Sequence, residues 1–184
     1  MSEYSDAEII ELFKDPLKRE SAFKLLVVKY QERLYWHCRR LVIGHEDADD
    51  ALQNTFVKAW KNLKNFRNES GLFTWLYRIA TNESLSLLRS NKKHSFNISR
   101  DENMKGSSYD KIETDPYFDG DETQIKLQKA IFTLPEKQRI VFNMKYYEEI
   151  KYQEMAKILK TSVGALKASY HHAVKKIEKY ILSE

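Results

Sequence analysis

Cysteine is almost absent from the sequence: Cys38 is the one thiol in 184 residues. A single thiol cannot form a disulfide within the chain, and it excludes a Cys-rich zinc site and an iron–sulfur cluster. The first fifteen residues carry acids where a signal peptide needs positive charge, and no apolar run approaches membrane-spanning length. We therefore expect a cytoplasmic protein that does not insert into a membrane.

Glycine and proline are scarce as well, with five and three residues. The prolines Pro16, Pro116 and Pro135 fall where a helical pattern would break in any case. The sequence shows no alternating strand pattern bounded by hairpin turns, no internal repeat and no Gly-rich phosphate loop. These absences predict an all-α fold.

Enzyme signatures are missing too. The sequence has no G-x-S-x-G, H-E-x-x-H or Walker motif, and its five histidines are not spaced with carboxylates as a metal site requires. His171 and His172 are neighbours on a predicted helix, so their rings point about 100° apart and cannot share an ion. We expect no enzyme activity, no metal and no cofactor.

Charge divides the chain into three parts. Residues 1–95 carry a net charge of +3, residues 96–121 of −4 and residues 122–184 of +5. The acidic part also loses helical periodicity and gathers Ser, Asn, Asp and Gly, which predicts a flexible linker. We therefore expect two small helical domains joined by this linker, each able to approach a polyanion.

The N-terminal part predicts a bundle of helices. Ser5 and Glu8 have capping-box spacing and open a short helix, which a long helix over 19–41 follows. A third helix begins among the acids of 46–50, and Ser70 is the expected N-cap of a fourth. The apolar positions expected to face the core are Phe23, Val27, Tyr30 and Leu34 in the first long helix, Leu52, Phe56, Ala59 and Leu63 in the next, and Leu72, Trp75, Leu76 and Ile79 in the last.

The C-terminal part predicts a helix-turn-helix. A short helix comes first, and Pro135 suits the first position of the helix after it. Residues 152–159 then form one short amphipathic helix, residues 160–162 a three-residue turn, and a longer helix starts at Val163. A short helix, a tight turn and a longer helix are typical of this DNA-binding motif.

The outer face of that longer helix carries donors for phosphates and base edges, and no carboxylate before Glu178. The alternative is a solvated basic face on an ordinary C-terminal helix, but the turn spacing favours DNA binding. The candidate DNA contacts are Lys167, Ser169, His171, Lys175 and Lys176, with His172 nearby.

A second candidate nucleic-acid site lies between residues 66 and 82, where aromatic side chains alternate with cations and amides. Such a set suits unpaired bases, because every base offers a face for stacking and an edge for hydrogen bonds. The alternative is an aromatic core, and for Trp75 taken alone the core interpretation is favoured. The set comprises Phe66, Arg67, Asn68, Phe73, Trp75, Tyr77, Arg78 and Asn82.

Three strings, in this order, carry a resemblance to a known family. They are DADDALQNTFVKAWKNL (47–63), GLFTWLYRIATNESL (71–85), and LPEKQRIVFNMKYYEEIKYQEMAKIL (134–159) followed by TSVGALKASYHHAVKKI. The chain resembles a bacterial RNA polymerase sigma factor of the extracytoplasmic-function group, over nearly all its length except the linker. The resemblance implies sigma domain two in 1–95, sigma domain four in 122–184, and a function in promoter recognition and melting.

The resemblance also implies contact residues and partners. Docking on the clamp helices of the polymerase beta-prime subunit is implied for Asp47, Asp49, Asp50, Gln53, Phe56 and Trp60, although the three acids taken alone are a solvated helix start. Capture of a flipped base of the minus-ten element is implied for the loop of Phe66, Arg67, Asn68, Glu69 and Ser70 with Asn82 beside it. Contact with minus-ten DNA is also implied for Trp75 and Arg78. Major-groove contacts to the minus-thirty-five element are implied for Lys167, Ser169, His171, His172 and Lys175. The implied partners are core RNA polymerase, including its beta flap, promoter DNA and, as a further candidate, an anti-sigma factor.

The sequence departs from the family pattern in its helix-turn-helix. Lys151 stands where a Ser or Thr commonly caps the first helix, Lys160 stands where a turn glycine is common, and the second helix lacks the arginines of many relatives. Fewer bidentate contacts to guanine are then available. Two other functions stay open at this point: a stand-alone helix-turn-helix regulator with an N-terminal ligand or dimerisation bundle, and a helical protein-interaction module without salt-dependent DNA binding.

Overall fold

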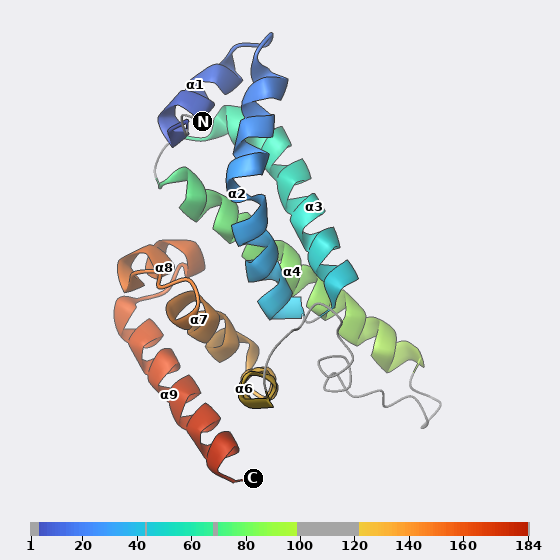
Figure 1. Cartoon of the computed structure of the whole chain (residues 1–184), viewed down its shortest axis with the longest axis vertical. Coiled ribbons are helices and arrows are strands. Elements are labelled where there is room, and N and C mark those ends of the chain that lie inside the picture. The colour runs from blue at the N-terminus through green and yellow to red at the C-terminus, as the bar shows by residue number, and fades with distance from the viewer. Residues whose placement is uncertain (1–3, 43, 68–69, 99–121, 184) are drawn as a thin grey trace. The chain divides into compact units, whose positions relative to one another are not determined.

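The computed structural model describes residues 4–42, 44–67, 70–98 and 122–183, most of which are helical (Figure 1). The chain divides into two compact units. The first unit comprises residues 1–42 and 46–88, and the second comprises residues 43–45 and 89–184. No strand occurs in the described ranges, so the all-α prediction is confirmed.

The described residues of the first unit form four α-helices and one 3₁₀ turn. They are α1 (Asp6–Lys14), α2 (Arg19–Val42), α3 (His45–Asn62) from its second residue on, η1 (Leu63–Asn65) and α4 (Leu72–Ile98) up to Leu88. The predicted capping box is present, since the Ser5 hydroxyl accepts from the Glu8 amide and the Glu8 carboxylate accepts from the Ser5 amide. The predicted start of α4 was wrong by one residue. The Gly71 carbonyl accepts the first helical hydrogen bond, from the Trp75 amide, so Ser70 lies just outside the N-cap position.

The core of the first unit is built on a different phase of α3 than the apolar pattern predicts. The buried positions of α3 are the small residues Ala48, Ala51, Thr55 and Ala59. Leu52 and Phe56, expected in the core, are only half-buried. Short side chains let this helix approach its neighbours closely, so the bulky residues beside them come to lie at the rim of the interface.

A similar shift affects α2 and α4. Phe23 and Val27 of α2 are half-buried, while Ala22 and Leu26, one position earlier, are fully buried. In α4, Leu72 and Leu76 are buried as expected, but Trp75 and Ile79 are half-buried. The expected core positions Tyr30, Leu34, Ala59 and Leu63 are confirmed.

The second unit contains α6 (Glu122–Phe132), α7 (Glu136–Tyr146), α8 (Tyr152–Leu159) and α9 (Val163–Leu182). The long helix α9 packs against the other three. Its buried residues Leu166, Ala173 and Ile177 recur at helical spacing, and the last two join a core with Ile131 and Phe142. The helix-turn-helix formed by α8 and α9 has the predicted bounds. Pro135 is the N-cap residue of α7 rather than its first helical residue.

The backbone of the turn between α8 and α9 is strained at Lys160. Lys160 adopts the left-handed conformation, with φ 51° and ψ 48°, which a glycine would adopt at no steric cost. Lys151 precedes α8 without a side-chain cap, as its residue type predicts. Ser162, by contrast, caps α9 by accepting a hydrogen bond of 3.2 Å from the Ala165 amide. Helix α9 therefore begins at a defined residue.

The predicted acidic linker, 96–121, lies outside the described residues from 99 onwards. Its first three residues belong to α4, which continues through Ile98. Within the part of the chain that the structure describes, every helix is too short or too polar to cross a membrane.

Candidate polymerase and nucleic-acid interfaces

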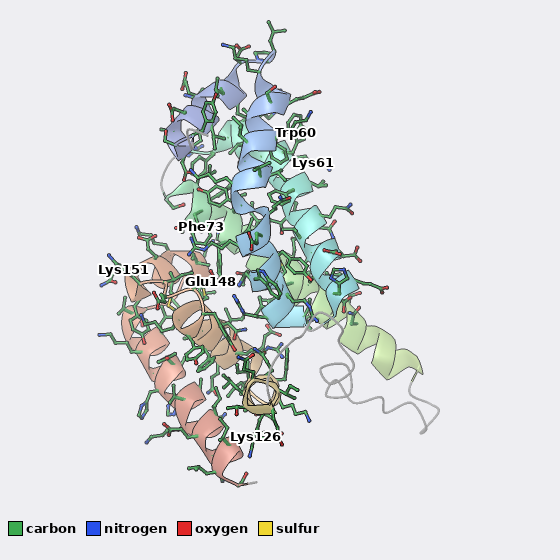
Figure 2. The ribbon with its side chains drawn as sticks, viewed as in Figure 1. Trp60, Lys61, Phe73, Lys126, Glu148 and Lys151 are labelled. Atoms are coloured by element: carbon green, nitrogen blue, oxygen red, sulfur yellow. The ribbon has the colours of Figure 1, made fainter. Side chains whose placement is uncertain are left out.

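One side of α3 carries four of the six residues expected to contact polymerase. Asp49, Gln53, Phe56 and Trp60 follow one another at steps of four, three and four, so they form one longitudinal strip, which we call the docking strip. Asp49 and Gln53 are exposed and Phe56 is half-buried. The indole of Trp60, labelled in Figure 2, is 38% exposed, so this strip combines carboxylate, amide and aromatic groups at the surface.

The other two acids do not lie on this strip. Asp50 is exposed about 100° around the helix from Asp49, and Asp47 is half-buried about 200° away. The surface does extend to Val57, which is 44% exposed and was not among the candidates. The sequence could have indicated Val57, because it lies between Phe56 and Trp60 and is not on the buried line of small residues in α3.

Aromatic rings support the end of the docking strip. The Trp60 ring meets the ring of Phe13 edge-on, with centroids 5.4 Å apart and an interplanar angle of 87°. It meets Phe23 at 5.1 Å and 80°, and Phe56 meets Phe23 at 6.2 Å and 87°. Such edge-to-face pairs stabilise by about 0.5–1.5 kcal/mol beyond the area they bury. Helices α1, α2 and α3 are therefore joined at this corner by one aromatic cluster.

The loop before α4 and α4 itself bring the candidate minus-ten residues together. The Phe66 ring lies 5.2 Å from the Trp75 ring, at an angle of 51°. Trp75, Arg78 and Asn82 succeed one another at steps of three and four, so they share one strip of α4. Asn82 is exposed, and Trp75 and Arg78 are half-buried. We call these residues with Phe66 the base-contact strip.

The remaining candidates near the base-contact strip differ in their surroundings. Arg67 is exposed and Ser70 half-buried, while Asn68 lies outside the described residues. Tyr77, grouped with the base-stacking aromatics by its sequence position, is fully buried and belongs to the core. Phe73, labelled in Figure 2, is half-buried. The guanidinium carbon of Arg33 lies 3.9 Å from its ring centroid, so a cation already covers that ring.

A buried polar contact lies behind the base-contact strip and was not signalled by any motif. The Thr81 hydroxyl donates to the Tyr77 carbonyl at 2.8 Å, so it accepts from His37 Nε2, which is 2.9 Å away. The His37 ring lies 3.8 Å from the Tyr77 ring. Burial, and then the nearby charge of Arg40, lower the pKa of His37 to about 3, so the ring is neutral. This contact joins α2 to α4 close to both Arg78 and Asn82 in the sequence.

The exposed face of α9 carries the candidate minus-thirty-five contacts on more than one strip. Lys167, His171 and Lys175 recur every four residues, are all exposed, and form one line. His172 is exposed about 100° from His171, and the half-buried Ser169 lies on the far edge of the face, about 200° from Lys167. The line of three is therefore the continuous surface, which we call the recognition line.

Two features beside the recognition line are not signalled by the sequence pattern. Apart from Lys167, the exposed residues in the first turns of α9 are the small Gly164, Ala165 and Ala168. A Cβ added at Gly164 would meet nothing within 4 Å, so the helix surface there is open. Tyr152 of α8 has the ammonium nitrogens of Lys145 and Lys167 at 5.4 and 5.9 Å from its ring centroid. Burial raises the pKa of the Tyr152 hydroxyl, so it stays a neutral donor.

Two family models match the chain, one in each half. "Sigma-70 region 2" matches residues 26–94, and "Sigma-70, region 4" matches residues 124–177. The first segment contains the docking strip and the base-contact strip, and the second contains α8 and most of α9.

Curated relatives match the chain over most of its length. RNA polymerase sigma factor YlaC of Bacillus subtilis is 32% identical over 163 residues, which are 88% of this chain and 92% of the relative. The ECF RNA polymerase sigma factor SigW of the same organism is 29% identical over 168 residues, 88% of this chain and 90% of the relative. RNA polymerase sigma-H factor of Pseudomonas aeruginosa is 29% identical over 97% of this chain and 95% of the relative.

Solved structures share the fold. The sigma factor RpoE of Bartonella quintana, solved in complex with the anti-sigma factor NepR, superposes with a TM-score of 0.71 at 23% identity, over 86% of this chain and 96% of that one. CnrH, solved in complex with the cytosolic domain of CnrY, gives a TM-score of 0.70 at 20% identity, over 97% of this chain and 98% of that one.

The helix-turn-helix and the two family matches define a DNA-binding transcription factor. The chain belongs to the extracytoplasmic-function group of bacterial RNA polymerase sigma factors. It is a transcription initiation factor whose partners are core RNA polymerase and promoter DNA. The alternative of a stand-alone regulator is not favoured, because the N-terminal half matches sigma region 2 rather than a ligand or dimerisation domain.

Proposed function

We propose that the two units divide the work of promoter recognition. The first unit docks on core polymerase through the docking strip and holds unpaired minus-ten bases at the base-contact strip. The second unit binds the minus-thirty-five duplex through the recognition line. The observation that carries this proposal is that the first unit has two chemically different strips, the docking strip on α3 and the base-contact strip on α4 and the loop before it. The residues of both strips are exposed or half-buried, and other residues form the core.

The docking strip has the composition of a protein interface. Trp60 and Phe56 offer large apolar area, of the kind that supplies most of the binding energy in interfaces. Asp49 and the exposed Asp50 beside it provide negative charge, which accelerates encounter with a basic partner and fixes the orientation of docking. A basic, partly apolar face of polymerase, the beta-prime clamp helices, is the proposed partner.

The base-contact strip suits an extruded base better than duplex phosphate. Phe66 and Trp75 provide aromatic faces, and Asn82 provides an amide that both donates and accepts hydrogen bonds. Flipping a base costs a few kcal/mol, and stacking returns about 1–3 kcal/mol per base. We propose that this strip and its loop, including Arg67, Asn68 and Ser70, favour the melted state of the promoter.

The recognition line suits the major groove of duplex DNA. Its lysines can contact phosphates or guanine edges, and the ring nitrogens of His171, which lies between them, can hydrogen-bond to a base edge. The small residues of the first turns let the backbone of α9 approach the groove closely. We propose Lys167, His171 and Lys175 as the principal contacts, with His172 and Ser169 at the edges of the footprint.

We further propose that the chain binds and performs no reaction of its own, since polymerase makes the RNA bonds, and that it works in the cytoplasm beside polymerase. RpoE and CnrH were each solved with a partner, an anti-sigma factor in the first case. Their fold similarity supports an anti-sigma factor as a third partner class for this chain.

The experiment that tests the division of work uses the full chain, core polymerase free of other sigma factors, and promoter fragments selected by the holoenzyme. We expect the holoenzyme to protect both promoter elements from nuclease and the chain alone to protect neither. A pre-melted bubble should remove the need for the base-contact strip but not for the docking strip. Specific protection of duplex DNA by the chain without polymerase would contradict the proposal.

A further inference from the structure

Helix α1 precedes the segment that matches sigma region 2, yet it reaches the end of the docking strip. The ring of Phe13 is 2% exposed and meets the Trp60 ring edge-on at 5.4 Å. Phe23, which contacts Trp60 from α2, also contacts Phe13, with centroids 6.2 Å apart. The indole thus rests on two rings, both from residues that precede the matched segment, 26–94, and one of them from a helix that lies wholly outside it.

Both ends of α1 are fixed to the rest of the first unit. At its start, the Asp6 carboxylate accepts from Lys29 at 2.9 Å and from the Tyr30 hydroxyl at 2.5 Å, while Lys29 also donates to the Tyr4 carbonyl at 2.8 Å. Near its end, Arg19 Nε donates to the Phe13 carbonyl at 3.4 Å. The position of Phe13 is therefore fixed by contacts that do not involve Trp60.

We propose that α1 is a positioning element for polymerase docking, and that Phe13 is the residue through which it holds the Trp60 indole in its binding orientation. The inference rests on the proposed function of the docking strip. A partly exposed tryptophan on a helix has several staggered side-chain conformations, and contact with two edge-on rings restricts them. Binding then does not have to order this side chain, and pre-ordering of one side chain improves affinity by about threefold to tenfold.

The competing explanation is that α1 merely stabilises the first unit. Ile9 separates the two, because it lies one turn earlier on α1 and is equally buried at 1% exposure. Ile9→Ala therefore removes packing between α1 and the unit without removing a ring from Trp60. Phe13→Leu keeps much of the buried apolar volume of Phe13 and removes only the ring, so it remains informative if Phe13→Ala does not fold.

The test is a double-mutant cycle on the dissociation constant of the full chain and core polymerase, measured well below the unfolding temperature of every variant. We expect Phe13→Ala and Phe13→Leu to weaken binding about threefold to tenfold, and Ile9→Ala to change it less than about twofold. In a Trp60→Ala background the effect of Phe13→Leu should vanish, because Phe13 acts through the indole. The near-UV circular dichroism of the indole should change in the Phe13 variants but not in Ile9→Ala.

Failure of the inference and failure of the docking strip give different results. If Trp60→Ala alone leaves the affinity for core polymerase unchanged, the docking strip is misassigned and the proposed role of α1 is wrong as well. If Trp60→Ala weakens binding but the Phe13 variants do not, only the positioning role is wrong. An effect of Phe13→Leu that persists in the Trp60→Ala background, or that Ile9→Ala reproduces, shows that α1 acts through stability.

Discussion

Phe66 and Trp75 form one aromatic pair, with ring centroids 5.2 Å apart, although one belongs to the loop after η1 and the other to the first turn of α4. The pair ties the loop to the helix in the absence of DNA. Both residues are half-buried rather than enclosed in the core. Under the proposed function, a base would meet an aromatic pair that is already in contact.

The first prediction concerns this pair and Asn82. Phe66→Ala with Asn82→Ala should leave core affinity and the closed promoter complex nearly unchanged. Open-complex formation should weaken by about 1–3 kcal/mol, because one aromatic face for base stacking is removed. The permanganate reactivity of unpaired thymines measures this change. The matched control is Ser86→Ala, one turn beyond Asn82 and also exposed. Reduced activity on a pre-melted template through weaker core binding would make Phe66 a packing residue.

Charge reversal on α3 is the second prediction. Asp49→Lys with Asp50→Lys should weaken core binding by about an order of magnitude, mainly through slower association, with an unchanged far-UV circular dichroism spectrum. Asp49→Lys alone should account for most of this, because Asp49 lies on the docking strip. Glu20→Lys is the control, since it likewise reverses the charge of an exposed acid near the start of a helix, in this case the first turn of α2. Equal effects at both helices would identify helix stability as the cause.

The third prediction is a pH dependence of stability due to His37. The pKa of His37 is about 3 in the folded protein and 6.5 as the ordinary value, so below pH 6.5 the unfolded chain binds a proton that the folded chain does not. The contribution of the neutral ring to stability is therefore complete above pH 6.5 and is lost as the pH falls towards 3. Between about pH 6 and pH 4 the free energy of unfolding should fall by about 2–3 kcal/mol.

In the full chain, tryptophan fluorescence reports on the first unit, because all three tryptophans, Trp36, Trp60 and Trp75, lie in that unit. Urea unfolding followed by tryptophan fluorescence then reports only this transition. Carboxylates contribute to the same pH range, so the quantity to compare is wild type minus His37→Gln. An identical pH dependence in the two proteins would show that His37 is not buried as a neutral ring.

The turn of the helix-turn-helix gives the fourth prediction. Lys160→Gly should stabilise the second unit by about 1 kcal/mol, because glycine adopts the left-handed conformation without the Cβ penalty. Lys157→Gly, three residues earlier in α8, should instead destabilise it by about 1 kcal/mol. Hydrogen exchange of the α8 and α9 amides measures both changes. Destabilisation by both substitutions would mean that Lys160 makes contacts that outweigh its backbone strain.

The recognition line is tested by the salt dependence of promoter binding. Lys167→Ala should weaken the closed complex and, if Lys167 contacts a phosphate, reduce the slope of log affinity against log salt by about 1. His171→Ala should weaken the closed complex with a smaller change in slope. Lys179→Ala, in the last turn of the same helix, is the control and should change neither. A slope change shared by Lys179→Ala would indicate a diffuse electrostatic effect of α9.

The helix-turn-helix could be predicted to the residue, because the turn has local signals: a capping serine at Ser162 and an apolar pattern that restarts after Lys160. The core of α3 could not be predicted from the same kind of pattern. Leu52 and Phe56 have the greater hydrophobicity, but alanines form the buried face, since how closely helices approach one another depends on the partner helices. The contact between His37 and Thr81 joins residues 44 positions apart, so no local pattern signals it.

The buried alanine face of α3 also affects how the sequence of such a factor can evolve. The interior of the first unit limits the size of Ala48, Ala51 and Ala59, where any larger side chain would force helices apart, but it places no such limit on Asp49 or Gln53. Substitutions that change the affinity for a partner can therefore accumulate on the exposed side of α3, while the buried alanine side keeps the helices packed. On the proposed docking role, a single helix thus separates two selective pressures, one for shape inside and one for affinity outside.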